Sequence, residues 1–106
     1  MQKIILDKKY FTLISDLQHR HILKVRHEEK NWIVCKVEQD IYIMAGLCPH
    51  AGASLSEGVC NIRGIVVCPL HGYKFDITKG RSADGHQYTF KSYRLKKSEQ
   101  AYFFEL

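Results

Sequence analysis

Two short segments of this chain repeat the same order of residue types, and this repeat limits the possible folds more than any other feature of the sequence. Residues 47–52 (LCPHAG) and 67–72 (VCPLHG) each contain a cysteine, a proline, a histidine and a glycine in that order. Thiolates and imidazoles are both ligands of transition metals. The candidate ligands follow the patterns C-x-H and C-x-x-H and are Cys48, His50, Cys68 and His71. A fold for this chain therefore has to bring the two segments to one metal site.

The spacing within the first segment distinguishes between two kinds of metal site. A single tetrahedral zinc holds its ligands at about 2.0–2.3 Å, usually with two to four residues between paired cysteines. Only one residue separates Cys48 from His50, and two steps of extended backbone rise by roughly 6.6 Å. A binuclear cluster suits this spacing better. The two cysteines would hold one iron and the two histidines the other, which is the Rieske ligand set for a [2Fe–2S] cluster. A structural zinc site remains the alternative.

The prolines and glycines of the two segments fit loops that surround such a cluster. Pro49 and Pro69 are the only two prolines of the chain. Each fixes φ and removes a backbone N–H, which stiffens the loop before metal arrives. Gly52 and Gly72 allow the backbone to approach the inorganic sulfides, whose negative charge attracts N–H donors.

Around this region, short apolar runs alternate with polar turns, which indicates an all-β protein. We expect a single domain over residues 1–106, with a loop-rich cluster-binding subdomain at about 46–80. All seven glycines lie between 46 and 85, and there only GIVVCP (64–69) has the pattern of a strand. The other expected strands are HILKVRH (21–27), WIVCKV (32–37), IYIMA (41–45), YTFKSYRL (88–95) and AYFFEL (101–106), with a weak helical turn near 16–21.

The runs CPHAGASLSEG (48–58) and IVVCPLHGYKFDITKG (65–80) resemble the cluster-binding part of the Rieske ferredoxins, the small electron carriers of multicomponent aromatic-ring dioxygenases. The resemblance is strong from Gly46 to Gly80 and elsewhere consists of strand pattern and total length. It implies a small antiparallel β sandwich with the cluster loops at one tip, where His50 and His71 would be exposed and form the electron exit. It also implies a flavin or iron–sulfur reductase and a terminal oxygenase as transient partners. We expect a monomer.

Three positions distinguish this chain from the respiratory-complex Rieske proteins. Those proteins carry an extra cysteine in each ligand loop, and the two cysteines form a disulfide; here the positions are Ala53 and Leu70. They also place a serine after the glycine of the second loop, where its hydroxyl bonds to a cluster sulfide; here the residue is Tyr73. Fewer donors stabilise the reduced cluster less, so we expect a potential at the low end of the Rieske range, about −150 mV.

Charge counting agrees with one-electron transfer at this site. Two ferric irons, two sulfides and two thiolates sum to a neutral oxidised cluster, which one electron makes singly negative. A cluster held by four cysteines is already negative when oxidised. Adding an electron to a neutral site is electrostatically easier, so histidine ligation raises the potential above that of plant-type ferredoxins.

The remaining polar and reactive side chains are interpreted as structural or as ordinary surface residues. Cys35 alternates with Ile33 and Val37 and is read as a buried core residue. Many Rieske proteins cover the cluster with a proline-containing loop; here residues 82–86 contain no proline, so the resemblance does not indicate the shape of this loop. The other residues given a structural or surface interpretation are Cys60, His19, His21, His27, His86, Trp32 and Tyr102–Phe104.

Composition and charge narrow the class of partners. Sixteen Lys and Arg against 11 Asp and Glu give a net charge of +5, with a local excess of four basic residues between 91 and 97. We read this excess as a solvated strand face, with a docking patch for an acidic partner as the alternative. No nucleic-acid-binding motif accompanies it. The first eleven residues do not form a signal peptide, and no apolar run could cross a membrane. A cytoplasmic protein is therefore expected.

Three functions are compatible with these observations. The first is a freestanding one-electron carrier between a reductase and a terminal oxygenase. The second is a redox small subunit of a larger enzyme, similar to assimilatory nitrite reductase. The third is a non-redox zinc or interaction module. The sequence argues against a self-contained oxygenase, because its catalytic iron needs a 2-His-1-carboxylate triad in a pocket and we see no second domain that would build one. We predict an electron-transfer protein and not an enzyme.

Overall fold

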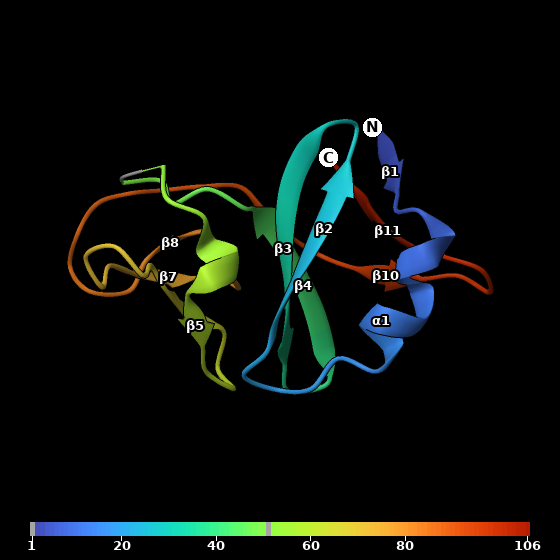
Figure 1. Ribbon diagram of the computed structural model, residues 1–106, viewed down its shortest axis with the longest axis horizontal. Helices are drawn as coiled ribbons and strands as arrows, with labels where there is room; N and C mark the ends of the chain where they lie inside the picture. Colours follow the sequence, from blue (N-terminus) through green and yellow to red (C-terminus); the bar gives the residue numbers. More distant parts are fainter. Residues whose placement is uncertain (1, 51) are drawn as a thin grey trace.

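The computed structural model describes residues 2–50 and 52–106, and most of its regular structure is antiparallel β-sheet. Figure 1 shows β1, β10, β11 and α1 at one end of the long axis, β2, β3 and β4 in the middle, and β5, β7 and β8 at the other end. The elements in chain order are β1 (Lys3–Ile5), the 3-10 helix η1 (Lys8–Tyr10), α1 (Phe11–Ser15), β2 (Ile22–His27), β3 (Lys30–Val37), β4 (Asp40–Ala45), the 3-10 helix η2 (Leu55–Glu57), β5 (Val59–Cys60), β6 (Ile65–Val67), β7 (Lys74–Asp76), β8 (Arg81–Ser82), β9 (Ser92–Arg94), β10 (Lys96–Lys97) and β11 (Tyr102–Glu105).

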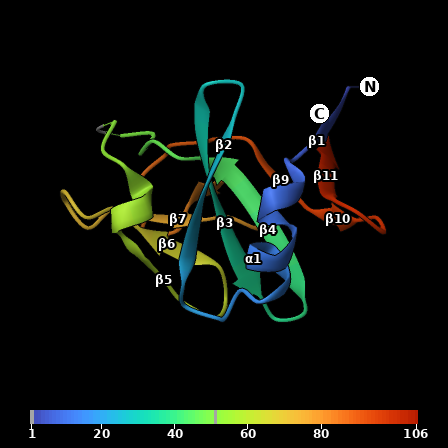
Figure 2. The same cartoon turned by 45° about the vertical axis from the view of Figure 1, so that its right-hand side comes forward.

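These strands form three antiparallel sheets. The central sheet has the order β2-β3-β4-β9, and a second sheet has the order β1-β11-β10, which joins the two ends of the chain. The third sheet, β5-β6-β7-β8, is built entirely from the glycine-rich region. The expected all-β, antiparallel class is therefore confirmed. Figure 2 shows β5, β6 and β7 together on the side of the central strands that is opposite to β10 and β11.

The hairpin of β2 and β3 forms where the alternating pattern places it. Its last pair is His27 with Lys30, and the turn between them has Glu28 and Glu29 at φ 49° and 66°. Two consecutive residues of positive φ are the mark of a type I′ turn, whose twist matches that of the flanking strands. The polar turn expected at this point is confirmed.

Strand β3 separates two apolar cores. Its side chains alternate from one face of the sheet to the other. Trp32 and Val34 belong to the first core, whereas Ile33, Cys35 and Val37 belong to the second. The first core, which we call the framework core, also takes in Ile14, Ile43, Leu95 and Phe104. The second, which we call the cluster-side core, takes in Met44, Leu55, Val66, Phe75, Ile77 and all four cysteines.

Three expectations about local structure differ from what the structure shows. The helical residues lie at 8–15 and not at 16–21. Arg20 has a φ of 74°, which a right-handed helix does not allow. Tyr10, Ile14 and Leu17 instead anchor this segment on the framework core. The glycine-rich region contains four strands where one was expected. Strands of two or three residues are too short to show a periodic pattern in the sequence. The expected strand at 88–95 is shortened to β9, because Thr89 bridges to Arg81 of the neighbouring sheet.

Among the described residues, no helix is long and apolar enough to cross a membrane.

Candidate metal centre

The first ligand loop follows β4 and the second follows β6, and the two loops are closed in the same way. The Cys48 N–H donates to the Ala53 carbonyl at 2.8 Å, and the Cys68 N–H donates to the Tyr73 carbonyl at 2.8 Å. The repeat seen in the sequence is therefore also a repeat in the backbone. Two stiff loops of similar shape present their side chains at one end of the molecule.

The glycine of each loop is required by the backbone conformation. Gly52 and Gly72 have φ values of 70° and 72°, in the left-handed region that only glycine adopts without strain. Their N–H groups donate to the carbonyls of Cys48 and Cys68 at 2.9 and 3.0 Å. A Cβ at either glycine would meet nothing within 4 Å. The turn itself, and not a lack of space, therefore selects glycine here.

The four predicted ligands divide into an inner pair and an outer pair. Cys48 is 3% exposed and Cys68 is 1% exposed, and both lie in the cluster-side core. His71 is exposed, whereas His50 is half-buried. The centroids of the two imidazole rings are 5.5 Å apart. The structure thus brings the two predicted histidines close together and buries the two predicted cysteines, although only His71 is as exposed as we expected.

The donor atoms in this arrangement fit a [2Fe–2S] cluster. Nδ1 of His50 is buried, and it has no hydrogen-bond partner among residues 2–50 and 52–106. Buried polar atoms in proteins are almost always paired, so the lone pair of this nitrogen is available for coordination. With the two thiols and His71 it completes a set of two sulfur and two nitrogen ligands, as a Rieske-type cluster requires.

Within the part of the chain that the structure describes, no three His, Cys, Asp or Glu side chains converge on one ion position. A structural zinc needs four such ligands around one ion, whereas a Rieske-type cluster divides two pairs of ligands between two metal atoms.

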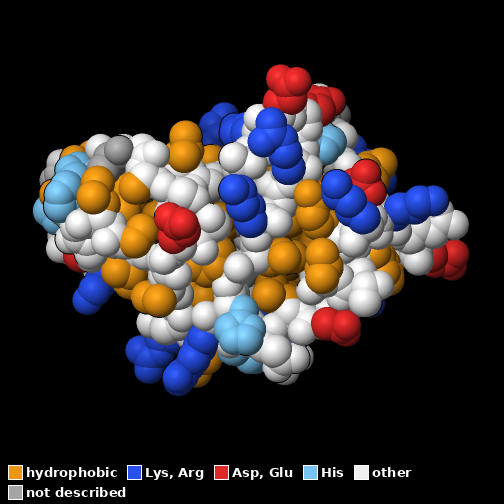
Figure 3. Space-filling view, in the orientation of Figure 1, with side chains coloured by type: hydrophobic (Ala, Val, Ile, Leu, Met, Phe, Trp, Pro, Cys, Tyr) orange, Lys and Arg blue, Asp and Glu red, His pale blue; other side chains and the backbone are white. Residues whose placement is uncertain are grey.

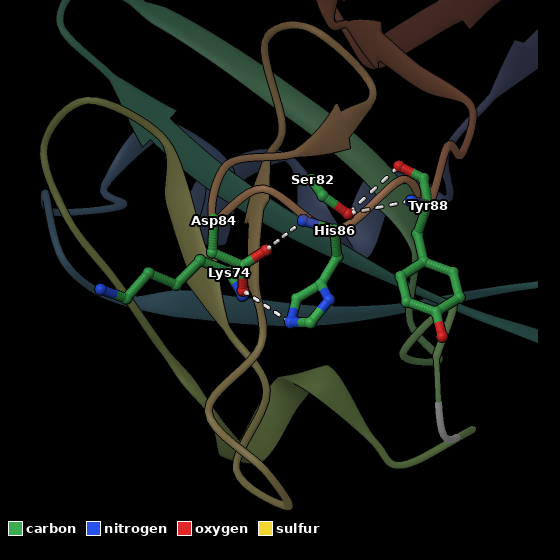
Figure 4. A network of polar contacts seen from close by, with 5 residues as sticks. All are labelled: Lys74, Ser82, Asp84, His86 and Tyr88. Atoms are coloured by element: carbon green, nitrogen blue, oxygen red, sulfur yellow. Dashed lines mark hydrogen bonds and ion pairs between the residues drawn. The ribbon is translucent and has the colours of Figure 1, made fainter.

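The segment after β8 forms the covering loop, defined here as residues 82–88, and polar contacts hold its shape (Figure 4). Ser82 and Tyr88 close it, since the Ser82 N–H donates to the Tyr88 carbonyl at 2.9 Å and the Tyr88 N–H donates to Ser82 Oγ at 3.2 Å. Within the loop, the Asp84 carboxylate accepts the backbone N–H groups of Lys74 and His86 at 2.8 and 3.3 Å. The donation from Lys74 is the main reason that the pKa of Asp84 lies below its usual value. These bonds define the loop without a proline.

A stack of three aromatic rings connects one of the predicted ligands with the covering loop. The Tyr73 ring stacks on the His50 ring at 3.9 Å and 15°, and on its other face it stacks on the His86 ring at 4.0 Å and 4°. His86 Nε2 lies 4.0 Å from the Asp84 carboxylate. The sequence predicted a surface position for His86, but it did not predict this stack. No pattern in a single sequence links positions 50, 73 and 86.

Cys35 and Cys60 are not part of the ligand set. Both are buried in the cluster-side core, where β3 meets β5. The Cys60 thiol donates to the His21 carbonyl at 3.7 Å. The hydrogen bond between the two thiols, followed by burial, raises the pKa of Cys35, and the same bond lowers the pKa of Cys60. The buried position expected for Cys35 is confirmed.

The basic residues near the C-terminus lie away from the ligand loops. Strands β9 and β10 carry Arg94, Lys96 and Lys97, and Figure 1 places β10 at the end of the molecule opposite to β7 and β8. Arg94 is 3.9 Å from Asp40 and Lys96 is 3.2 Å from Glu105, while Lys97 lies over the Phe11 ring at 5.2 Å. Each of these three basic groups has a partner within the chain, which fits the solvated strand face expected here.

Comparisons with known proteins agree with this geometry. A family model described as the Rieske [2Fe-2S] domain matches residues 8–94. The ferredoxin component of the naphthalene 1,2-dioxygenase system of Pseudomonas putida is 36% identical over 69 residues, and the match covers 65% of this chain and 65% of that protein. The ferredoxin component of the alkene monooxygenase system of Xanthobacter autotrophicus is 25% identical over 83 residues, covering 78% of this chain and 60% of that protein.

Solved structures support the fold. A ferredoxin of Sphingomonas yanoikuyae B1 has a TM-score of 0.76 at 21% identity and covers 99% of this chain and 97% of its own. A putative small subunit of an NADPH nitrite reductase has a TM-score of 0.74 at 17% identity, with complete coverage of both chains. The same fold therefore occurs both in a ferredoxin and in a protein described as a putative enzyme subunit.

Proposed function

Because this chain belongs to the Rieske [2Fe–2S] domain family, we propose that it is a one-electron carrier that takes electrons from a reductase and delivers them to a terminal oxygenase. Its cofactor is accordingly a [2Fe–2S] cluster. The observation that carries the proposal is that two similarly closed loops carry two buried thiols and two neighbouring imidazoles. Relatives from Pseudomonas and Ralstonia are named as ferredoxin components of dioxygenase systems, and the match covers only 65% of their length.

We propose that Cys48 and Cys68 hold the inner iron and that His50 and His71 hold the outer iron. When bound, the cluster accepts and releases a single electron. The buried cysteines keep their sulfurs away from water, since both lie within the cluster-side core. The exposed His71 places one ligand ring at the surface, where a partner protein can approach it. The chain acts by binding and positioning, and it is not an enzyme by itself.

The partners belong to the same proposal. A solved complex of an oxygenase and a ferredoxin of carbazole 1,9a-dioxygenase contains a chain with a TM-score of 0.73 to this one, at 24% identity, covering 98% of this chain and all of that chain. Two apolar side chains flank the ligands here, as Leu47 is 57% exposed and Leu70 is 56% exposed. Apolar groups around a ligand that reaches the surface suit a small and transient redox contact. We propose a reductase and an oxygenase as its transient partners.

The remaining expectations are proposals that depend on this one. We propose a single domain of residues 1–106 whose cluster-binding part is about 46–80, a monomer in solution, a cytoplasmic location and a potential near −150 mV. Gel filtration, cell fractionation and a redox titration test the last three. Limited proteolysis of the loaded protein tests the first, since a single domain should resist cleavage as one unit.

The decisive experiment is spectroscopic. The purified protein should contain about two irons and two sulfides per chain, and reduction by dithionite should give a Rieske-type EPR signal. The reduced protein should then pass one electron per chain to cytochrome c as an artificial acceptor. His71→Ala should abolish the signal, whereas His19→Ala, at a histidine outside the site, should keep it. One zinc per chain and no EPR signal would support the non-redox alternative. Stable co-purification with a large catalytic chain would support an enzyme subunit.

A further inference from the structure

Three stacked rings connect a predicted cluster ligand with the molecular surface. Tyr73 lies between His50 and His86, with centroid separations of 3.9 and 4.0 Å and interplanar angles of 15° and 4°. The outermost ring belongs to His86, whose side chain is 44% exposed. Two nearly parallel contacts on opposite faces leave the Tyr73 ring little freedom to rotate.

Backbone contacts position two of the three rings in the stack. Tyr73 belongs to the second ligand loop, where its carbonyl accepts the Cys68 N–H at 2.8 Å. His86 is held through Asp84, which accepts the His86 N–H at 3.3 Å and lies 4.0 Å from its ring. Figure 4 shows the His86 ring beside the Asp84 carboxylate, with Tyr88 on the other side of the covering loop. The Tyr88 ring adds a tilted contact to His50 at 5.5 Å.

The two histidine ligands are therefore unequal. The Tyr73 ring covers one face of His50, whereas its contact with His71 is tilted by 56° at 6.5 Å and is not a stack. His50 is half-buried and His71 is exposed. A stacked neighbour restricts the orientation of an aromatic ring, and an exposed ring lacks this restriction.

We propose that Tyr73 and His86 are positioning residues for His50, which fix the plane of its imidazole and keep water off one of its faces. This inference rests on the proposed function, since it assumes that His50 is a cluster ligand. Rieske clusters change from neutral to singly negative when they are reduced, so nearby water stabilises the reduced state more than the oxidised state. Solvent exposure and the surroundings of the ligands are known to tune cluster potentials. The stack accordingly keeps the potential low.

The ring faces, and not the tyrosine hydroxyl, make the contacts that matter. Tyr73→Phe therefore preserves the stack, and Tyr73→Leu removes it while keeping an apolar side chain of similar reach. At the surface end, His86→Ala and His86→Phe both remove the imidazole and any charge on it. The difference between them isolates the aromatic ring. Gln87→Ala changes the adjacent exposed residue of the same loop and serves as the matched control.

The test is a redox titration of the five cluster-loaded variants, followed by EPR of the reduced state. We expect Tyr73→Leu to raise the reduction equilibrium constant three- to tenfold, which at the tenfold end is a positive shift of about 59 mV. Its EPR g-values should also change or broaden, because the His50 plane is no longer fixed. His86→Ala should give a smaller shift in the same direction. Tyr73→Phe, His86→Phe and Gln87→Ala should stay within twofold of the parent protein.

Failure of this inference can be distinguished from failure of the proposed function. If the parent protein holds no [2Fe–2S] cluster, the proposed function is wrong. If the parent is loaded and Tyr73→Leu has the parent's potential and g-values, the positioning role is wrong. If Tyr73→Leu cannot be loaded, the comparison of His86→Ala with His86→Phe decides, because both change an exposed side chain. Equal potentials for those two variants would overturn the proposal.

Discussion

The two cores on either side of β3 differ in what fills them. The framework core is closed by protein alone: Phe104 is fully buried and packs its ring against Trp32 at 5.3 Å and against Tyr93 at 4.8 Å. The cluster-side core is bounded by strands of two or three residues and contains the two proposed thiolate ligands. Figure 3 shows histidine side chains gathered at the end of the molecule where the short strands lie.

Strand β3 therefore contributes side chains to two cores that are stabilised in different ways. Apolar packing alone stabilises the framework core, since a closely packed interior needs no other partner. The third sheet is so small that bound cofactor should supply a large part of its stability, because ligand binding favours the folded state. We therefore expect loss of the cluster to loosen β5 to β8 and to leave β2 to β4 intact.

The largest expected effect comes from removing a proposed ligand. Cys68→Ala should abolish the visible absorption of the cluster. In hydrogen exchange, amides of β6 and β7 should lose protection in this variant, whereas amides of β3 should keep it, because the framework core is unchanged. Cys35→Ala, at a buried cysteine outside the ligand set, is the control and should keep the cluster. Equal loss of protection in β3 and β6 would show that the two regions unfold as one unit.

The next effect compares one phenylalanine from each core. Phe104 and Phe75 are both fully buried, so replacing either by alanine should lower the free energy of unfolding by about 3–5 kcal/mol. Urea unfolding of the loaded protein measures this loss. Only Phe75→Ala should also speed release of the cluster, because Phe75 lies in the same core as the ligand thiols. Faster release in Phe104→Ala instead would break the distinction between the cores.

A smaller effect is expected at the glycines of positive φ. Gly72→Ala places a side chain in the left-handed region at φ 72°. This backbone conformation lowers the stability of a residue with a Cβ by about 1–2 kcal/mol. Because the strain falls on a ligand loop, we expect weaker retention of iron, measured by transfer to a chelator. Gly85→Ala has a similar φ of 90° in the exposed covering loop. It should cost about the same stability but leave iron retention close to that of the parent protein.

The smallest effect concerns acid pH and the covering loop. The pKa of Asp84 is lowered in the folded protein, so the charged carboxylate favours the folded loop above the ordinary carboxyl value of about 3.9. This contribution is lost as the pH falls through the lowered pKa. Asp84→Ala should speed hydrogen exchange at the Lys74 and His86 amides several-fold at neutral pH. An unchanged rate at both amides would mean that the loop is held by Ser82 and Tyr88 alone.

How far the site could be predicted depends on how local its signals are. Cys48, His50, Cys68 and His71 were identifiable because their types and spacing lie within two short segments. The hairpin of β2 and β3 was identifiable because a polar turn separates two alternating runs. The strands β5 and β8 were missed, since two residues are too few to show any period. The stack of His50, Tyr73 and His86 was missed because ring contacts across such separations leave no pattern in one sequence.

The ligand types, their pairing into two similar loops and the all-β class follow from the sequence, because these depend on neighbouring residues and backbone chemistry. The difference between the two histidines, in contrast, follows from the folded structure. Half-burial of His50 and exposure of His71 depend on where the covering loop folds, and that loop is held by contacts to Lys74 from ten residues away. The structure also places Lys96 and Lys97, on β10, at the end of the molecule opposite to β7 and β8, since charge along a chain does not reveal which face a strand presents.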